Sequence, residues 1–358
     1  MRGLRKHLTP FAPDQSGATS VLFELGGIVV ICDAGGCTGN VCGFDEPRWH
    51  SRRSAVFSAG LRDMDAILGR DDKLVLELAD AAGKIDASFA AIVGTPVPAV
   101  IGTDYRALRR MAERSCGLPV ITVDTNGMEL YDRGASKAYL ALFDRFATQA
   151  LPVEPGRVGV LGANPLDLGV TVADDVAQAV PHAVCYGMGA GLDDVRRASA
   201  AERNLVVAPS GLAAARLLER RFGTPYEVRD PLAERIADRL GDVSGMRVLV
   251  VHQQVRANGL RDALTGRGAA DVTCATWFMS EPELCRPGDA RLREEDDLEE
   301  LVGAGGFDLL VGDPALWPIV RGFSGQVADL PQFPLSGTMG YLPHRRPCVR
   351  PGASGGTP

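Results

Sequence analysis

Short runs of apolar, largely β-branched residues alternate along the first half of the chain with longer segments of helical periodicity. The runs predict three strands, at residues 27–31, 89–93 and 119–123. Helices are expected over 58–83, 104–114 and 135–148, with Thr103 as the N-cap of the second and a Gly/Pro turn after residue 93. This order of strand, turn and helix is typical of a parallel sheet covered by helices.

The same pattern continues in two further blocks after a plausible linker at 151–156. The second block has predicted strands at 157–162, 182–185 and 204–208, and predicted helices at 192–202 and 212–222. The third has predicted strands at 247–251, 272–277 and 308–312, a helix at 254–264 and a charged, solvated helix at 291–300.

The fold class that follows is α/β, with three consecutive domains and mostly parallel sheets, because 358 residues are too many for one ordinary core. The expected divisions are an N-terminal extension (1–16), a cysteine-loop domain (17–150), a second α/β domain (151–243), a third (244–342) and a disordered tail (343–358).

Composition narrows the class of protein. The chain is 46% hydrophobic and 23% charged, which is typical of a soluble globular protein, and its net charge of -7 argues against a nucleic-acid partner. Eight cysteines in so long a chain do not form a disulfide framework, so a cytoplasmic location is expected. No signal peptide and no run long enough to cross a membrane is evident, so no membrane association is expected.

The strongest chemical signal is the loop from Cys32 to Gly43, which directly follows the first predicted strand. Cys32, Cys37 and Cys42 lie there among four glycines. Soft thiolates select zinc, copper(I) or iron–sulfur clusters, and glycines let the backbone approach a bulky cluster. The sequence therefore predicts a metal or cluster site at the end of the first strand.

The three thiols are not equivalent. Cys32 ends the strand and has a competing role in core packing, since free cysteine often acts as a small buried hydrophobe. Cys37 lies in the glycine-rich turn and is the best ligand candidate, with Cys42 between the two. A structural zinc site is a live alternative, although a second ligand pair is missing and His50 is the only nearby imidazole.

Other motifs carry weaker predictions. Residues 44–53, rich in charge, are interpreted as a solvated loop, with a docking rim as the functional alternative. Residues 187–191 predict a plain turn, and Ser210 a helix N-cap. Weak ligand candidates lie near strand ends: Thr95, Asp104, Asp124 and Asn126. Three other cysteines are interpreted as structural: Cys274, Cys285 and Cys348.

Four stretches resemble the component 1 subunits of nitrogenase and nitrogenase-like oxidoreductases. Residues 33–39 look like that family's glycine-rich loop with its cluster-ligating cysteine, here Gly36 and Cys37. Residues 69–80, 95–104 and 119–127 resemble a helix start, a Cys-Pro turn and the following strand. The resemblance implies three Rossmann-like domains and agrees with the three blocks.

The departures from the family pattern are as informative. Thr95 stands where the family turn has a second cluster cysteine, and Ala208 where nitrogenase has the thiolate that holds its large cofactor. The resemblance therefore implies no molybdenum-type cofactor. It leaves a 4Fe–4S cluster ligated by Cys37 together with Cys32 or Cys42, and a cluster shared across a subunit interface would explain the incomplete ligand set.

The leading functional hypothesis is a component 1 subunit that relays electrons from an ATP-dependent iron–sulfur partner through a 4Fe–4S cluster to an organic substrate, such as a tetrapyrrole. Its other expected partner is a homologous component 1 subunit, in a homo- or heterodimer. The chain lacks a P-loop, which fits ATP handling by the partner. The alternative is a cluster-free scaffold, a cofactor-assembly carrier or a small-ligand-binding protein.

Overall fold

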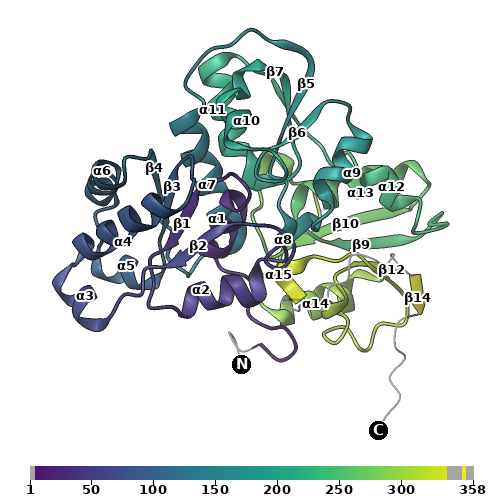
Figure 1. Ribbon diagram of the computed structural model, residues 1–358. Helices are drawn as coiled ribbons and strands as arrows, with labels where there is room; N and C mark the ends of the chain where they lie inside the picture. Colours follow the sequence, from purple (N-terminus) through teal and green to yellow (C-terminus); the bar gives the residue numbers. More distant parts are fainter. Residues whose placement is uncertain (1–4, 337–348, 352–358) are drawn as a thin grey trace.

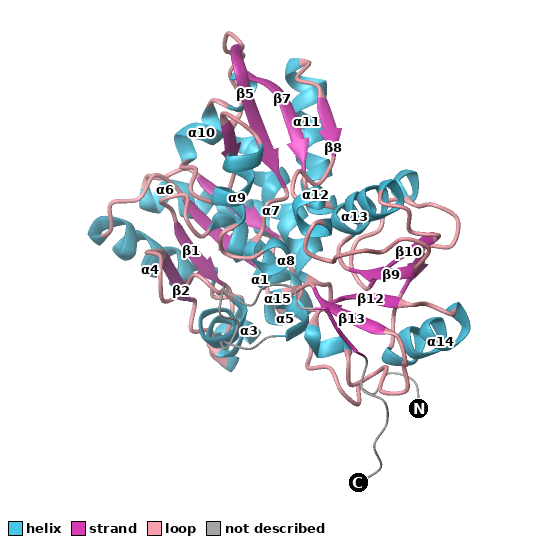
Figure 2. Ribbon diagram, turned by 90° about the vertical axis from the view of Figure 1, so that its right-hand side faces the viewer, coloured by secondary structure: helices cyan, strands magenta, loops and turns pink. Residues whose placement is uncertain are grey.

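The computed structural model describes residues 5–336 and 349–351, and they form three mostly parallel sheets with helices between and around them (Figures 1 and 2). The predicted α/β class with three mostly parallel sheets is confirmed. The domain boundaries given above stay predictions, although α1 already begins at Asp14, inside the expected N-terminal extension.

The first sheet has four parallel strands in the order β2-β1-β3-β4. Its strands are β1 (Ile28–Ile31), β2 (Ala55–Ser58), β3 (Ala90–Val93) and β4 (Val120–Val123). The helices of this part are α1 (Asp14–Leu22), α2 (Gly36–Asn40), α3 (Asp63–Leu68), α4 (Asp71–Lys84), α5 (Pro96–Ile101), α6 (Tyr105–Cys116) and α7 (Tyr131–Phe146), and a π-helical turn, η1, spans Val41–Asp45.

Successive side chains along these strands point to opposite faces of the sheet and so form two hydrophobic cores. Ile28 and Val30 belong to the buried cluster that includes α4 and α6, whereas Val29 belongs to the cluster that includes α1 and α7. Helices α1 and α7 approach very closely, because a Cβ on Gly17 would lie 1.7 Å from the Tyr131 carbonyl oxygen and one on Gly134 would lie 1.7 Å from that of Asp14. These two glycines permit the crossing.

The second sheet is also parallel, in the order β6-β5-β7-β8. Its strands are β5 (Glu154–Leu161), β6 (Ala183–Cys185), β7 (Ala201–Val206) and β8 (Tyr226–Val228). The helices here are α8 (Pro165–Leu168), α9 (Val172–Ala179), α10 (Leu192–Arg196), α11 (Leu212–Phe222) and α12 (Ala233–Ala237), with 3-10 turns η2 (Ala198–Ala200) and η3 (Pro209–Gly211). Leu161 and Val206 share the core of α1 and α7, which therefore lie between the first two sheets.

The third sheet has the order β11-β10-β9-β12-β13-β14. Its strands are β9 (Arg247–Val251), β10 (Asp271–Thr276), β11 (Ala290–Arg291), β12 (Leu309–Gly312), β13 (Gln326–Asp329) and the antiparallel β14 (Val349–Pro351). The helices are α13 (Gln254–Gly266), α14 (Glu295–Gly305) and α15 (Phe333–Ser336), with 3-10 turns η4 (Pro282–Leu284) and η5 (Pro314–Leu316). One continuous core joins α12 and α13 to the second and third sheets.

Tertiary pairing overrides two local predictions in the second block. The predicted linker at 151–156 contains the start of β5, because Glu154 pairs with Ala201 and an irregular register before Val158 accommodates Pro155 and Gly156. The helix predicted over 192–202 is also shorter, because α10 ends at Arg196, the next residues form η2 and the pairing begins β7 at Ala201.

Several predicted turns and helix caps were also wrong. Residues 96–101 form α5 rather than a turn, because a proline at the first helical position is pre-organised for a helix. Asp104, not Thr103, caps α6 by accepting hydrogen bonds from the backbone of Arg106 and Ala107. Ser210 lies in η3 and makes no cap bond. In the predicted disordered tail, residues 349–351 form β14, and the rest lies outside the described residues.

Candidate functional site at the cysteine loop

The cysteine loop lies at the topological switch point of the first sheet, where the chain adds successive strands on opposite sides. Strands β1 and β3 are neighbours, and the chain adds β2 on one side of them and β4 on the other. In open parallel sheets, ligands bind in the crevice outside the carboxyl ends of two such strands. Cys32 follows β1 and Thr95 follows β3, so these two predicted site residues lie at the carboxyl ends of the two strands that flank this crevice.

Asp33 organises the loop. Its buried carboxylate accepts hydrogen bonds from the Thr38 backbone N–H at 2.7 Å, from the Thr38 hydroxyl at 2.9 Å and from the Ser58 hydroxyl at 2.6 Å. Gly35 precedes α2 with a φ of 110°, a conformation that side chains disfavour. The start of α2 is thereby fixed against the end of β2, which orients the residues that follow.

Cys37 lies in α2 and Cys42 in η1, five residues apart, and both side chains are half-buried. The turn η1 closes with a hydrogen bond of 2.8 Å from the Glu46 N–H to the Val41 carbonyl, and such π turns are frequent at functional sites. Burial, and then the negative charge of Asp33, raise the pKa of both thiols. Their thiolates are therefore disfavoured unless a cation binds, and this donor chemistry fits a metal site.

Cys32 takes the core-packing role that competed with ligation. It lies with Leu74 and Leu78 in a buried cluster, and burial, with Asp71 and Asp33 adding, raises its pKa to about 12. Within residues 5–336 and 349–351, no three His, Cys, Asp or Glu side chains are grouped so as to hold a metal ion. The described part of one chain therefore does not bring the three predicted ligands together.

Thr95 closes the crevice instead of opening it. Its hydroxyl donates a hydrogen bond of 2.7 Å to the Cys32 carbonyl, while the Thr125 hydroxyl donates one of 2.6 Å to the Gly94 carbonyl. A Cβ on Gly94 would lie 2.4 Å from the Thr125 carbonyl oxygen, so the ends of β3 and β4 are packed tightly. A Cβ on Gly36, by contrast, would meet no other atom, and the space above α2 is open.

The weaker candidates have structural partners. Asp104 caps α6, and Asp124 lies 3.8 Å from the Lys137 ammonium group. The backbone N–H groups of Asn126 and Gly127 donate to the buried carboxylate of Asp14, at 2.8 and 2.7 Å. These contacts fix the turn after β4 and assign no chemistry to it.

The segment at 44–53 is solvated only in part: residues 50–53 are exposed as the solvated-loop interpretation predicts, but Glu46 and Arg48 are buried. Arg48 is 1% exposed and pairs with Glu46 through two hydrogen bonds, of 2.7 and 2.9 Å. It also donates to the Ser20 carbonyl at 2.6 Å and to the Gly187 carbonyl at 3.0 Å. Arg48 thus joins the end of the cysteine loop to α1 and to the plain turn at 187–191, which was predicted as such.

Buried polar residues that the sequence reasoning missed lie where the second and third sheets meet. Each of these sheets also has a topological switch point, between β5 and β7 in the second and between β9 and β12 in the third. Their ends are joined by a 2.9 Å hydrogen bond from the Gln253 side-chain amide to the Val207 carbonyl. The buried polar side chains that follow these strands are Asn164, Asp167, Ser210, His252 and Arg256. Polar residues directly after apolar strands were the available signal.

The residues at this junction do not fit a metal cofactor held by a thiolate. Ala208 is buried, and a Cβ on the adjacent Gly162 would lie 2.8 Å from its carbonyl oxygen. The position has no thiol, and its backbone is closed by direct packing.

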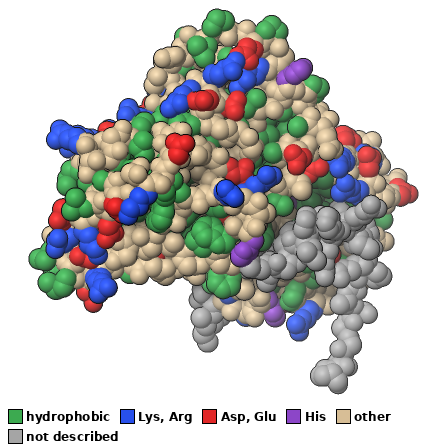
Figure 3. Space-filling view, in the orientation of Figure 1, with side chains coloured by type: hydrophobic (Ala, Val, Ile, Leu, Met, Phe, Trp, Pro, Cys, Tyr) green, Lys and Arg blue, Asp and Glu red, His purple; other side chains and the backbone are tan. Residues whose placement is uncertain are grey.

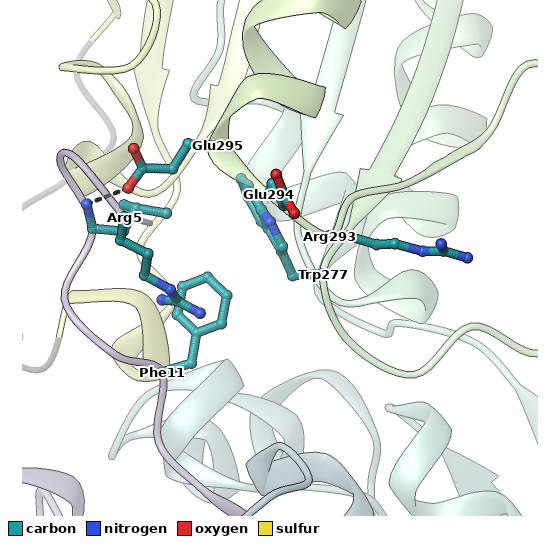
Figure 4. Close-up of a pocket in the computed structure, with 7 residues that line it drawn as sticks. Arg5, Phe11, Trp277, Arg293, Glu294 and Glu295 are labelled. Carbon is teal, nitrogen blue, oxygen red and sulfur yellow. Dashed lines mark hydrogen bonds between the residues drawn. The ribbon is translucent and has the colours of Figure 1, made fainter. Parts of the chain in front are cut away.

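A separate cavity of about 60 Å³ lies between the N-terminal segment and the third sheet (Figure 4). The Arg5 guanidinium lies 3.8 Å from the centre of the Phe11 ring, with Trp277 opposite. The Glu295 carboxylate accepts hydrogen bonds from the backbone N–H groups of residues 6–8. None of the cysteine-loop residues lines this cavity, so it is distinct from the candidate site.

Cys274 is buried, Cys285 is exposed, and Cys348 lies outside the described residues. Among the helices of the described part of the chain, none is long and apolar enough to cross a membrane.

A family model described as nitrogenase component 1 type oxidoreductase matches residues 15–238, which is more than half of the chain. The chain belongs to this family. The match includes the cysteine loop and the first two sheets, and it confirms the resemblance given by the sequence motifs. The search of curated proteins by sequence found no match.

Two solved structures of nitrogenase Cp1 have the fold of this family member. The structure at pH 6.5 has a TM-score of 0.74 at 12% identity, over 96% of this chain and 89% of that one. The structure at pH 5 has a TM-score of 0.68 at 14% identity, over 94% of this chain and 86% of that one. The three-sheet architecture is therefore that of nitrogenase component 1.

Proposed function

We propose that this family member is a subunit of a nitrogenase-like reductase, in which two copies bind one 4Fe–4S cluster through Cys37 and Cys42 of each. The observation that carries the proposal is the pair of half-buried thiols beside a strand crossover in a loop fixed by Asp33. Such a cluster supplies one-electron transfer when bound. The chain would supply its ligands and its burial.

Ligand number supports sharing between copies. A 4Fe–4S cluster takes about four cysteine thiolates. Cys32 is committed to the core, and Thr95 has no thiol, so one loop offers Cys37 and Cys42 alone. Two copies related by a two-fold axis would offer four thiols. Family members form oligomers, and the open space above Gly36 is where a second copy would approach.

An exposed apolar surface at the same sheet supports a docked subunit. Helices α3 and α5 contact one another and follow the carboxyl ends of β2 and β3. Their exposed apolar side chains form what we call the α3–α5 patch: Met64, Ile67, Leu68, Val100 and Ile101. In Figure 3, hydrophobic side chains reach the surface at the left-hand end, where α3 lies in Figure 1. A surface of this kind marks an interaction site.

The electron donor in this proposal is an ATP-dependent iron protein, the type of partner with which the family works. The chain has no G-x-x-x-x-G-K-[ST] motif, so nucleotide hydrolysis would belong to the partner. The electron acceptor would be an organic molecule, such as a tetrapyrrole, bound where the second and third sheets meet. That junction lies at two further strand crossovers, which is where α/β proteins bind ligands.

The first experiment is iron and acid-labile sulfide analysis of protein purified without oxygen, with the oligomeric state measured on the same sample. The proposal expects a dimer with about two iron and two sulfide per chain, because four-iron clusters carry equal amounts of each. Cys37→Ser and Cys42→Ser should each lose most of the iron. Cys285→Ser, at an exposed thiol of the third domain, is the matched control and should keep it.

Two other outcomes would count against the proposal. Unchanged iron in both Cys37→Ser and Cys42→Ser would overturn the ligand assignment. A folded wild-type protein without iron, expressed together with cluster-assembly proteins and with homologous subunits supplied, would favour the cluster-free alternative: a scaffold, an assembly carrier or a small-ligand-binding protein.

A further inference from the structure

Asp33 carries a buried negative charge without a positive partner among the described residues. Its side chain is 1% exposed. The groups that donate hydrogen bonds to its carboxylate are all neutral, namely the Thr38 N–H and the hydroxyls of Thr38 and Ser58. In the described part of the chain, no lysine, arginine or histidine forms an ion pair with it. Since a buried charge is costly unless it is paired, the charge of Asp33 calls for an explanation.

The hydrogen bonds that fix the loop do not require this charge. The Asp33 Oδ2 accepts from the Thr38 N–H, and its Oδ1 accepts from the two hydroxyls. An asparagine oxygen would accept the same bond from the Thr38 N–H. Its amide group would donate to the hydroxyls of Thr38 and Ser58, because a hydroxyl accepts as well as donates. A neutral side chain of the same shape therefore suffices to hold the loop, and the charge serves another purpose.

The charge lies beside both thiols that are the proposed cluster ligands. The Thr38 nitrogen, 2.7 Å from the Asp33 carboxylate, is two covalent bonds from the Cys37 Cα, so a carboxylate oxygen lies within about 5.6 Å of that carbon. Burial, followed by the charge of Asp33, raises the pKa of the Cys37 thiol and that of the Cys42 thiol. One fixed anion therefore acts on both proposed ligands of the same chain.

We infer that Asp33 lowers the reduction potential of the cluster that Cys37 and Cys42 are proposed to bind, and so makes the site a stronger one-electron reductant. The inference rests on the proposed function. One electron from the donor adds one negative charge to the site, and no bond forms or breaks. A buried anion opposes that added charge, since net charge and burial set the potential of such clusters. In a dimer, each copy would contribute one such carboxylate.

A lowered potential restricts the class of donor and of acceptor. The donor has to be a stronger reductant than the site, which agrees with a donor driven by ATP hydrolysis. The acceptor is then an organic molecule of low reduction potential, which weaker reductants leave unreduced. Asp33 thereby acts through the thiols beside it, as a positioning residue for charge, and it touches neither donor nor acceptor.

The test is an EPR-monitored redox titration of full-length protein purified without oxygen. Asp33→Asn should raise the equilibrium constant for reduction at least tenfold, which is about 59 mV for a one-electron couple. Ser58→Ala keeps the charge and removes one donor to it, so it should lower the same constant. Asp174→Asn, at an exposed position of α9, makes the same change in net charge and should leave the constant unchanged.

A wild-type potential in iron-loaded Asp33→Asn would overturn the inference. An equal rise in Ser58→Ala would also overturn it, because a disturbed loop would then explain both results. If Asp33→Asn binds no iron, Ser58→Ala decides: a potential below that of wild type supports the inference, and an unchanged or higher one overturns it. Iron analysis of the same samples keeps the proposed function separate. Wild-type protein without iron refutes both, whereas iron-loaded variants with unchanged potentials refute the role of Asp33 alone.

Discussion

The Thr95 hydroxyl donates a hydrogen bond of 2.7 Å to the backbone carbonyl of Cys32. The two residues follow neighbouring strands of the first sheet, and the bond ties the two sides of the crevice together. The family places a cysteine at the Thr95 position in the resemblance described above. In this chain a short side chain that bonds backbone takes its place, and the crevice is closed by a hydrogen bond.

Replacing Thr95 with valine should therefore destabilise the protein. The change keeps the shape but leaves the buried Cys32 carbonyl without this donor, at a cost of about 1–2 kcal/mol in the free energy of unfolding. Thr265→Val, at an exposed position of α13, is the control and should change stability by less than about 0.5 kcal/mol. Urea unfolding compares them, and equal midpoints would refute the role of the bond.

Arg48 should be among the most sensitive positions around the first sheet. Arg48→Met removes the cation that pairs with buried Glu46 and two donors to the Ser20 and Gly187 carbonyls, so we expect a loss of about 3–5 kcal/mol. Arg52→Met is the matched control, because Arg52 is exposed and its carboxylate contact is 3.8 Å. Similar urea midpoints for the two variants would contradict this prediction.

Two glycine substitutions should have opposite effects, one at the crossing of α1 and α7 and one at an exposed position of α4. Gly134→Ala would place a methyl group 1.7 Å from the Asp14 carbonyl oxygen and should destabilise by about 2 kcal/mol or more. Gly83→Ala, at an exposed position of α4 with open space around it, should stabilise by about 0.5–1 kcal/mol. Thermal unfolding of both variants checks the sign, and a destabilised Gly83→Ala would be the unexpected result.

Asp313 should make stability fall as the pH rises from about 4 to 6. Burial raises its pKa from 3.8 to about 6 in the folded protein, so between these values the unfolded chain has lost the proton that the folded state retains. The penalty is absent below pH 4, complete above about pH 6, and worth about 3 kcal/mol.

Asp313→Asn should therefore flatten the dependence of unfolding free energy on pH in that window, although it also weakens the bonds from the Ala315 and Gln332 N–H groups. Asp271→Asn, at an exposed position, should leave the slope unchanged. The comparison is made by urea unfolding at each pH, and parallel curves for wild type and Asp313→Asn would exclude Asp313 as the source.

The local sequence pattern predicted strands and helices correctly where its periodicity agrees with the burial of the side chains. The apolar runs at 27–31 and 247–251 are β1 and β9, and the amphipathic segment at 212–222 is α11 with the same bounds. It was unreliable where a distant pairing decides, as in β5, which begins inside a predicted linker because Glu154 pairs with Ala201. Helix ends also differed, since capping depends on side-chain geometry that spacing does not specify.

The sequence by itself determined the α/β class, the family and the cysteine loop, because strand periodicity and a glycine-rich motif are local properties. Only the tertiary structure separated Cys32 from Cys37 and Cys42, since core packing depends on helices that come later in the chain. It alone buried Arg48 and the polar side chains of Asn164, Asp167 and Arg256. The physical reason is that desolvation and charge pairing arise between segments far apart in sequence, and no local pattern encodes them.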